Sequence, residues 1–153
     1  MISIQVDTRE KPAEYARIGE QFDALGVHHF RSKLYVGDYQ NLDNARLVID
    51  RKKGLLELAG NVCQQHDRFR AELVRAQEVG IKMVILVEFH RLAPQCLEDV
   101  RRWYNPRLKV SPKAITGERL YRALYTMQQK YGLGFEFCLE SQTGQKIVEI
   151  LTR

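Results

Sequence analysis

Two acids and a lysine in the segment GDYQNLDNARLVIDRK, residues 37–52, have the types and the spacing of a hydrolytic metal site. Asp50 ends an otherwise apolar run, where a buried strand excludes carboxylates unless something pairs with them. In a hairpin centred on Asn44, Asp38 lies directly across from Asp50. Strand alternation puts Lys52 on the same face. We therefore expect these three side chains to meet.

The chemistry of such a cluster follows from the repulsion between its carboxylates. At about 4 Å and an effective dielectric of about 20, two carboxylates repel by about 4 kcal/mol, and a proton or a divalent cation removes this repulsion. Mg²⁺ prefers oxygen ligands and often uses one or two carboxylates with waters and phosphate oxygens. A cation there could polarise a phosphodiester and activate water, while the lysine steadies the transition state. A surface cluster of ion pairs explains the three residues alone equally well.

Length, charge and cysteine usage bound the class of protein. The 153 residues suit one compact domain. The 24 Lys+Arg against 19 Asp+Glu give a formal net charge of +5, which favours polyanionic partners. The three cysteines form no CxxC pair, so a disulfide scaffold and a zinc ribbon are both disfavoured. Without a leader-like start or a membrane-length apolar run, we expect a soluble, cytoplasmic protein.

The elements that must position the acids alternate between strands and helices. Strands are predicted at residues 2–6, 27–34, 34–40, 46–52, 82–88 and 135–140. Helices are predicted at residues 12–25, 55–79, 95–104, 118–131 and 143–151. The second of these could break in two at Gly60, Asn61 and the polar run QQHDR, residues 64–68. The apolar run KMVILVE is typical of a strand buried on both faces. This order predicts a single α/β domain with helices on a mixed central sheet.

Three ordered motifs resemble the nuclease domain of the XPF family of structure-specific endonucleases, within the PD-(D/E)XK superfamily. They are VDTRE at 6–10, VGDY at 36–39 and IDRKKGLLEL at 49–58, against a family pattern of GDY, a spacer, ERK and a downstream acid. The resemblance is clear over residues 1–90, whereas residues 91–153 resemble small phage and bacterial members. It implies a restriction-endonuclease-like fold, with one XPF-type nuclease domain spanning residues 1–153.

The resemblance also implies roles for individual residues. Asp38 would be the principal metal ligand, Asp50 the second ligand, and Lys52 the catalytic lysine. Arg51 would be the basic residue of the ERK motif. Three residues of the first motif would supplement the catalytic site, the first of them also as a metal ligand: Asp7, Arg9 and Glu10.

The sequence departs from the family pattern in three places. The family's glutamate is Asp50 here, one methylene shorter, so the metal must sit closer to the strand or be bridged by water. The acid expected after the lysine is displaced to Glu57. Residues 132–134 imitate the turn of a helix-hairpin-helix module, but a strand is predicted directly after them. We therefore expect this DNA-binding module to be missing.

A basic segment at residues 101–113 is a second candidate for contact with DNA. Its cations can neutralise phosphates while its aromatic rings stack on exposed bases. The candidate DNA-binding residues are Arg101, Arg102, Trp103, Arg107, Lys109 and Lys113. A solvated loop anchored to the core by its tryptophan is nearly as good an interpretation.

Together these features predict a DNA endonuclease dependent on Mg²⁺ or Mn²⁺. Branched or flap DNA is its expected substrate, a role in DNA repair or recombination would follow, and relatives suggest a homodimer. The alternative is a catalytically silent DNA-binding or dimerising module of the same fold. A nucleotide phosphohydrolase is disfavoured because the sequence has no glycine-rich phosphate loop.

Overall fold

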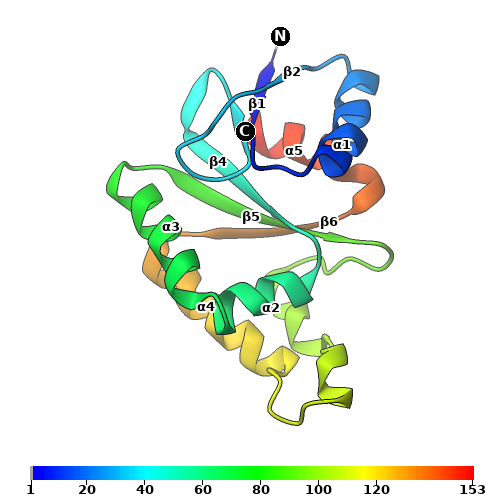
Figure 1. The fold of residues 1–153 in the computed structure, drawn as a ribbon, viewed down its shortest axis with the longest axis vertical. Helices are drawn as coiled ribbons and strands as arrows, with labels where there is room; N and C mark the ends of the chain where they lie inside the picture. Colours follow the sequence, from blue (N-terminus) through cyan, green and yellow to red (C-terminus); the bar gives the residue numbers. More distant parts are fainter. Residues whose placement is uncertain (1) are drawn as a thin grey trace.

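A mixed six-stranded sheet forms the centre of the molecule in the computed structural model, which describes residues 2–153 (Figure 1). The strands are β1 (Ser3–Val6), β2 (His28–Arg31), β3 (Tyr39–Asn41), β4 (Asn44–Lys52), β5 (Lys82–Phe89) and β6 (Gly134–Leu139). Their order is β2-β1-β3-β4-β5-β6. β3 is antiparallel to both neighbours, and the other pairs are parallel. The predicted α/β fold with a mixed sheet is confirmed.

Five α-helices and three short 3-10 helices surround this sheet within residues 2–153. The α-helices are α1 (Pro12–Ala24), α2 (Leu55–Cys63), α3 (His66–Glu78), α4 (Gly117–Tyr131) and α5 (Thr143–Leu151). The 3-10 helices are η1 (Leu97–Arg102), η2 (Pro106–Lys109) and η3 (Glu140–Gln142). The helical stretch predicted at 55–79 is broken at Gln64 and Gln65. The short helix predicted near 95–104 forms as the 3-10 helix η1. No helix in the described part of the chain is long and apolar enough to cross a membrane.

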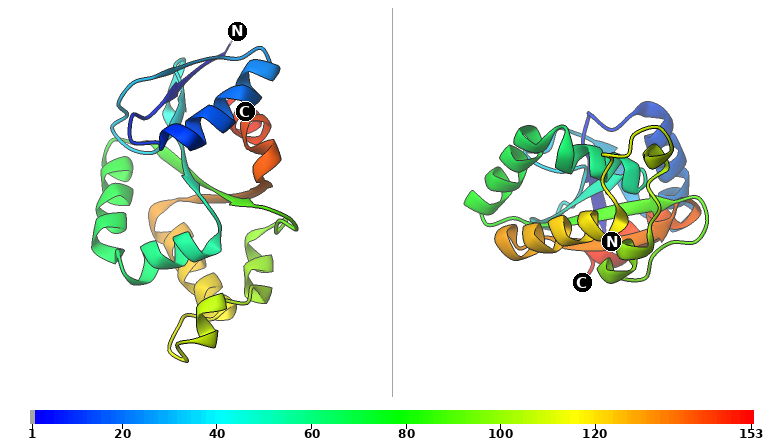
Figure 2. Two further views of the ribbon diagram at one scale, coloured as in Figure 1. Left: turned by 45° about the vertical axis from the view of Figure 1, so that its right-hand side comes forward. Right: turned by 90° about the horizontal axis from the view of Figure 1, so that it is seen from below.

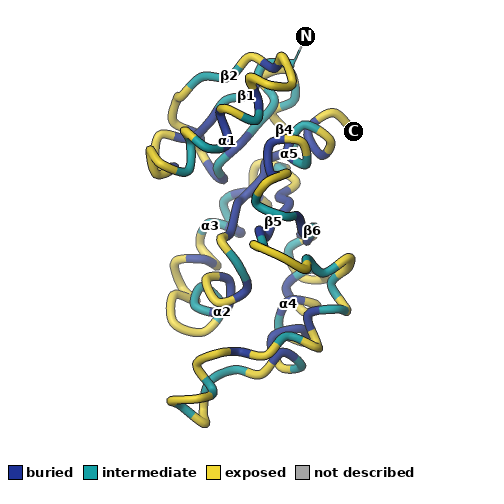
Figure 3. Tube along the Cα trace, turned by 90° about the vertical axis from the view of Figure 1, so that its right-hand side faces the viewer, coloured by how far each residue is buried: buried dark blue, intermediate teal, exposed yellow. Residues whose placement is uncertain are grey.

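The helices form two layers, one on each face of the sheet (Figures 1 and 2). α1 and α5 pack on one face, where Ile49 of β4 lies in the core. α2, α3 and α4 pack on the other face, where the neighbouring Val48 lies in a second core. β5 is buried from Met83 to Val87, as expected of an apolar run covered on both faces, and Figure 3 shows this buried centre in dark blue.

The hairpin of β3 and β4 is irregular, and this irregularity decides which residues face each other. Asn41 pairs with Asn44, but the next pair joins Gln40 to Val48, so that β4 bulges between them. Tyr39 then pairs with Ile49, and continuing this register by one residue places Asp38 opposite Asp50. The predicted opposition therefore holds at the site, although the chain turns at Leu42 and Asp43 and the bulge restores the register.

Candidate active site

The backbone around Asp38 is held tightly at the start of β3. The preceding Gly37 has φ +75°, and a Cβ there would lie 2.4 Å from Cγ2 of Val48, so only glycine fits. The Asp38 N–H donates to the carbonyl of Ile49 over 2.8 Å. One carboxylate oxygen, Oδ2, accepts from the backbone N–H of Arg51 over 2.7 Å. These contacts fix the Asp38 carboxyl beside β4.

Asp50 and Lys52 meet Asp38 on the face of β4 that also carries Val48. Both side chains are buried, and Lys52 Nζ lies 3.3 Å from Asp50 Oδ2. The ammonium also lies 5.2 Å from the centre of the Phe69 ring. Despite the nearby lysine, Asp50 Oδ2 accepts no well-formed hydrogen bond from residues 2–153. A buried carboxylate oxygen that is in ion-pair contact with a lysine, but accepts no well-formed hydrogen bond, keeps lone pairs with which it can bind a hard cation.

The electrostatics of the two aspartates also favour a bound proton or cation. Burial, the negative charge of Asp50 and then that of Glu10 raise the pKa of Asp38 well above its ordinary value of 3.8. Burial and the nearby Glu72 raise the pKa of Asp50. Burial alone would lower the pKa of Lys52, but both aspartates outweigh it and raise this pKa, so the lysine stays charged. The site is a pair of acids that disfavours double ionisation, with a permanent cation beside it.

A cavity of about 670 Å³ opens beside the pair. Arg9, Arg68 and Glu72 line it together with both aspartates and Lys52. The sequence analysis missed Glu72, which lies on α3 and accepts the Gly37 N–H over 3.1 Å. The sequence indicates this residue only weakly, because Glu72 is simply an acid one turn after Phe69, next to the buried residues of this helix.

Asp7, predicted as a further metal ligand, is engaged elsewhere. It accepts from the backbone N–H groups of Leu34 (2.8 Å) and Arg9 (3.1 Å), and from Arg9 Nε over 2.6 Å. Burial would raise its pKa, but these bonds outweigh burial and lower it. Within residues 2–153, no three His, Cys, Asp or Glu side chains are gathered closely enough to hold a metal ion together. A site with Asp38 and Asp50 alone fits Mg²⁺, which commonly completes its shell with waters and phosphate oxygens.

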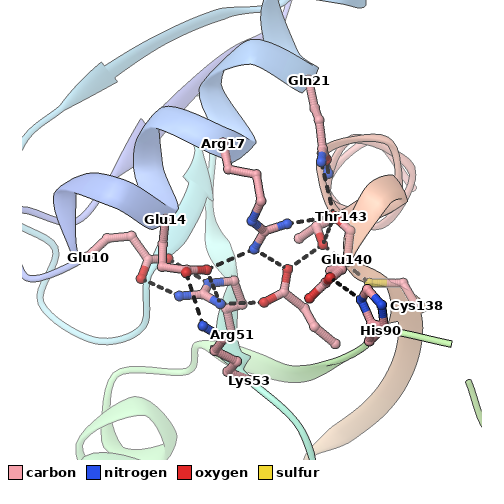
Figure 4. A network of polar contacts seen from close by, with 12 residues as sticks. Glu10, Glu14, Arg17, Gln21, Arg51, Lys53, His90, Cys138, Glu140 and Thr143 are labelled. Atoms are coloured by element: carbon pink, nitrogen blue, oxygen red, sulfur yellow. Dashed lines mark hydrogen bonds and ion pairs between the residues drawn. The ribbon is translucent and has the colours of Figure 1, made fainter.

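Arg51 and Glu10, also predicted for the site, lie on the opposite face of β4. The Arg51 guanidinium donates to both carboxylate oxygens of Glu10, over 2.9 and 2.8 Å (Figure 4). It also contacts Glu88 and lies 3.2 Å from Glu14. Tyr39 donates its hydroxyl to Glu10 over 2.7 Å. Arg51 and Glu10 therefore pair with each other across from the two aspartates, and both still line the cavity that opens beside these aspartates.

This ion network extends to the C-terminal part of the chain. Arg17 of α1 pairs with Glu14 over 2.8 Å and with Glu88 over 2.6 Å. Its other amino group donates to the carbonyl of Glu140 over 2.5 Å, and the Thr143 hydroxyl donates to Glu88. The network thus joins α1, β4, β5 and α5. No sequence motif indicated Arg17, Glu14 or Glu88. Arg17 and Glu14 are three residues apart in α1, but the contacts of Glu88 with Arg17 and Arg51 join residues distant in sequence.

Some of the predicted DNA-binding residues are paired or packed in the structure, and others are exposed. Arg101 pairs with an acid of α4 and stacks 4.1 Å from the centre of a tyrosine ring, and Arg102 pairs with Asp99. Trp103 packs against the core, as the solvated-loop interpretation proposed. Arg107 and Lys113 line a second cavity, whereas Lys109 is exposed outside it.

Glu57, the displaced acid, lies in the first turn of α2. Its carboxylate accepts from the backbone N–H of Lys53 over 2.8 Å. It lines both cavities. Its charge raises the pKa of Lys52, with a smaller effect than burial or either aspartate has. Glu57 is therefore a neighbour of the site.

A family model decides to which group of proteins this arrangement belongs. The ERCC4 domain model matches residues 6–151, nearly the whole chain. The chain belongs to the ERCC4-domain family. This membership confirms the resemblance to the XPF family that the three motifs indicated. No curated protein sequence matches this ERCC4 domain.

Two solved structures share the fold of this ERCC4 domain. XPF from Aeropyrum pernix matches with a TM-score of 0.68 at 23% identity, over 97% of this chain and 63% of that chain. XPF from Aeropyrum pernix in complex with DNA matches with a TM-score of 0.68 at 22% identity, over 99% of this chain and 64% of that chain. The ERCC4 domain thus spans less than two thirds of the XPF chains that it resembles.

Proposed function

We propose that residues 1–153 form one XPF-type nuclease domain and act as a metal-dependent DNA endonuclease. The observation that carries the proposal is the pair of carboxyls, Asp38 and Asp50, on neighbouring strands beside the Lys52 ammonium, which lies 3.3 Å from Asp50 Oδ2. Family membership and the likeness to XPF structures, one of them bound to DNA, support the same function. Branched or flap DNA is the proposed substrate class.

The side chains of the site divide the chemistry among them. Asp38 and Asp50 would hold Mg²⁺ or Mn²⁺, which supplies positive charge to polarise the phosphodiester and to activate water. Lys52 keeps its proton and stabilises the negative charge that develops on the phosphate oxygens. Arg9 and Arg68 line the same cavity and are placed to bind the phosphate before reaction. Water forms the new P–O bond, one ester P–O bond breaks, and the leaving oxygen takes up a proton.

The experiment is a cleavage panel with single-stranded, duplex, flap, splayed and four-way DNA in Mg²⁺, Mn²⁺ or EDTA. We expect cleavage by the parent only with a divalent cation. Asp38→Ala and Asp50→Ala should each lower the rate roughly 100-fold or more, the scale typical of removing one electrostatic catalytic group. Asp43→Ala is the matched control, because Asp43 is exposed at the turn of the same hairpin. Full activity of the Asp38 and Asp50 variants would refute the proposal.

Isothermal titration with Mg²⁺ separates the nuclease from a catalytically silent module. We expect the parent to bind the cation and both alanine variants to lose this binding, because the two carboxylates are the proposed ligands. A parent that binds no Mg²⁺ through these carboxylates and cleaves none of the substrates would support the silent module.

A further inference from the structure

A second cavity, of about 800 Å³, lies between α2 and the segment 105–119. Four residues line both this cavity and the one beside the two aspartates: Lys53, Glu57, Asn61 and Gln65. The two cavities are therefore neighbours that meet along this row of residues at the start of α2 and beyond its end. We call the part between α2 and residues 105–119 the distal groove.

The distal groove is lined by cations that have no acidic partner. The side chains of Arg107, Lys113 and Arg119 are exposed and form no ion pair or hydrogen bond within residues 2–153. Lys53 also lines the groove but pairs with Glu14 over 3.4 Å, and Glu57 is the one acid among the lining residues. Other arginines nearby are paired, as Arg122 is with Glu118 over 3.1 Å. Free positive charge is thus concentrated where the surface is concave.

The outer wall of the distal groove is held in place by buried contacts. Asn105 is buried, and its side chain donates to the carbonyl of Ile115 over 2.9 Å and accepts the Arg107 N–H over 3.0 Å. At the start of α4, a Cβ on Gly117 would lie 2.4 Å from the carbonyl oxygen of Trp103. The segment is therefore packed against η1 and the core, and its cations project from a fixed support.

We propose that the distal groove binds a single-stranded arm of the DNA substrate and leads it to Asp38 and Asp50. This inference rests on the proposed nuclease function. Cations along a concave track suit the flexible backbone of a single strand, whereas a rigid duplex keeps its phosphates on a convex cylinder. Leu56, Ala59 and Ile115 add apolar surface to the lining, which suits the exposed faces of bases. A substrate with a single-stranded arm next to a duplex meets both requirements.

Two double variants with equal loss of charge test the proposal. Lys113→Ala with Arg119→Ala removes two cations of the distal groove. Lys109→Ala with Arg122→Ala is the control, because it removes two exposed cations from the same segment and the same helix outside the groove. Binding of a fluorescent single strand and of a duplex of equal length is measured by anisotropy in EDTA over a series of salt concentrations. Circular dichroism and thermal melting check that both variants remain folded.

For the groove variant, we expect the slope of log affinity for the single strand against log salt to become shallower by about 1.4, or about 0.7 for each lost phosphate contact. At about 0.15 M salt this corresponds to a loss of affinity of roughly tenfold. The affinity of the control variant for the single strand should stay within about twofold of the affinity of the parent. The affinities of the two variants for the duplex should differ from each other much less than their affinities for the single strand. Equal loss of single-strand binding in both variants, or an equal loss of duplex binding in the groove variant, would overturn the proposal.

The design separates failure of this inference from failure of the proposed function. Binding in EDTA requires no cleavage, and neither variant alters Asp38, Asp50 or Lys52. If the parent cleaves DNA with Mg²⁺ but the two variants bind the single strand equally, the distal groove is wrong and the nuclease proposal survives. If the groove variant alone loses single-strand binding but the parent cleaves nothing, the groove is a binding site and the nuclease proposal fails.

Discussion

At the scale of single residues, Gly37 controls where the Asp38 carboxyl lies. Gly37→Ala should destabilise the fold by about 1–2 kcal/mol from the positive φ and by about 1–3 kcal/mol more from the contact with Val48. Urea unfolding measures this loss, and cleavage should fall with it because Asp38 is displaced. Gly80→Ala is the control, since Gly80 has φ +73° but a Cβ there would have no neighbour within 4 Å. Equal losses in the two variants would contradict the steric argument.

Asp38 itself should reduce stability while no cation is bound. Asp38→Asn removes a buried like charge, and its side-chain oxygen can still accept the Arg51 N–H. In EDTA at pH 8, the melting temperature should rise by roughly 2–4 °C for each kcal/mol of repulsion relieved. Mg²⁺ should raise the melting temperature of the parent but not that of the variant.

The pH dependence of this effect has a definite sign. The pKa of Asp38 is higher in the folded protein than its ordinary value of 3.8, so the folded state holds the proton more tightly. The parent therefore loses stability as the pH rises from about 4 through the folded pKa. The advantage of Asp38→Asn should be absent near pH 3.5 and should grow toward neutral pH. Melting curves in EDTA over this range measure it, and a variant less stable than the parent at pH 8 would contradict the argument.

At the scale of elements, the ion network fixes α1 against the ends of β4 and β5. Arg51→Met would leave Glu10 and Glu88 buried without their main cation, and a broken buried pair typically costs about 3–5 kcal/mol. Urea unfolding should show this loss. Arg153→Met is the control: Arg153 also holds a carboxylate with two bonds, at 2.6 and 2.8 Å, but it is about half exposed. A loss of no more than about 1 kcal/mol is expected there.

The order of helices and strands could be predicted from the sequence because each has a strong local pattern. The run 82–88 is continuously apolar, and it forms β5 between two parallel neighbours. The predicted helix at 12–25 begins at Pro12, which suits a first turn, and it ends at Ala24. The short helix predicted near 95–104 forms over six residues as a 3-10 helix that packs against α4.

Only part of the site could be predicted, because some of its contacts join residues of one hairpin and others join residues far apart in the sequence. Asp38, Asp50 and Lys52 belong to one hairpin, so strand alternation alone brought them together. The same alternation sends Arg51 to the other face, where the partner Glu88 lies 37 residues away. No local pattern could reveal that pairing, nor the approach of Glu72 from α3. Motifs that resemble a family predicted which residues matter, but not which face each one occupies.

At the scale of the whole molecule, two polar centres meet at the end of β4. Asp50 and Lys52 belong to the candidate active site and Arg51 to the ion network, and three members of that network, Glu10, Glu14 and Arg51, also line the cavity beside the aspartates. β4 supplies both centres from consecutive residues, with Asp50 and Lys52 on one side and Arg51 on the other. The distal groove extends only the first centre, so the surface proposed to bind DNA lies on one side of the sheet.

The alternation along β4 has a consequence for how the chain folds. A strand paired one residue out of step would turn each side chain to the opposite layer. Arg51 would then enter the layer of Phe69, away from Glu10 and Glu88, while Asp50 would join those two acids. Such a misfolded form would lose favourable charge contacts on both faces of the sheet. Its free energy would therefore be raised more than that of a slipped strand with only apolar side chains. The charged residues proposed to act in DNA cleavage therefore also disfavour an incorrect pairing register of β4 during folding.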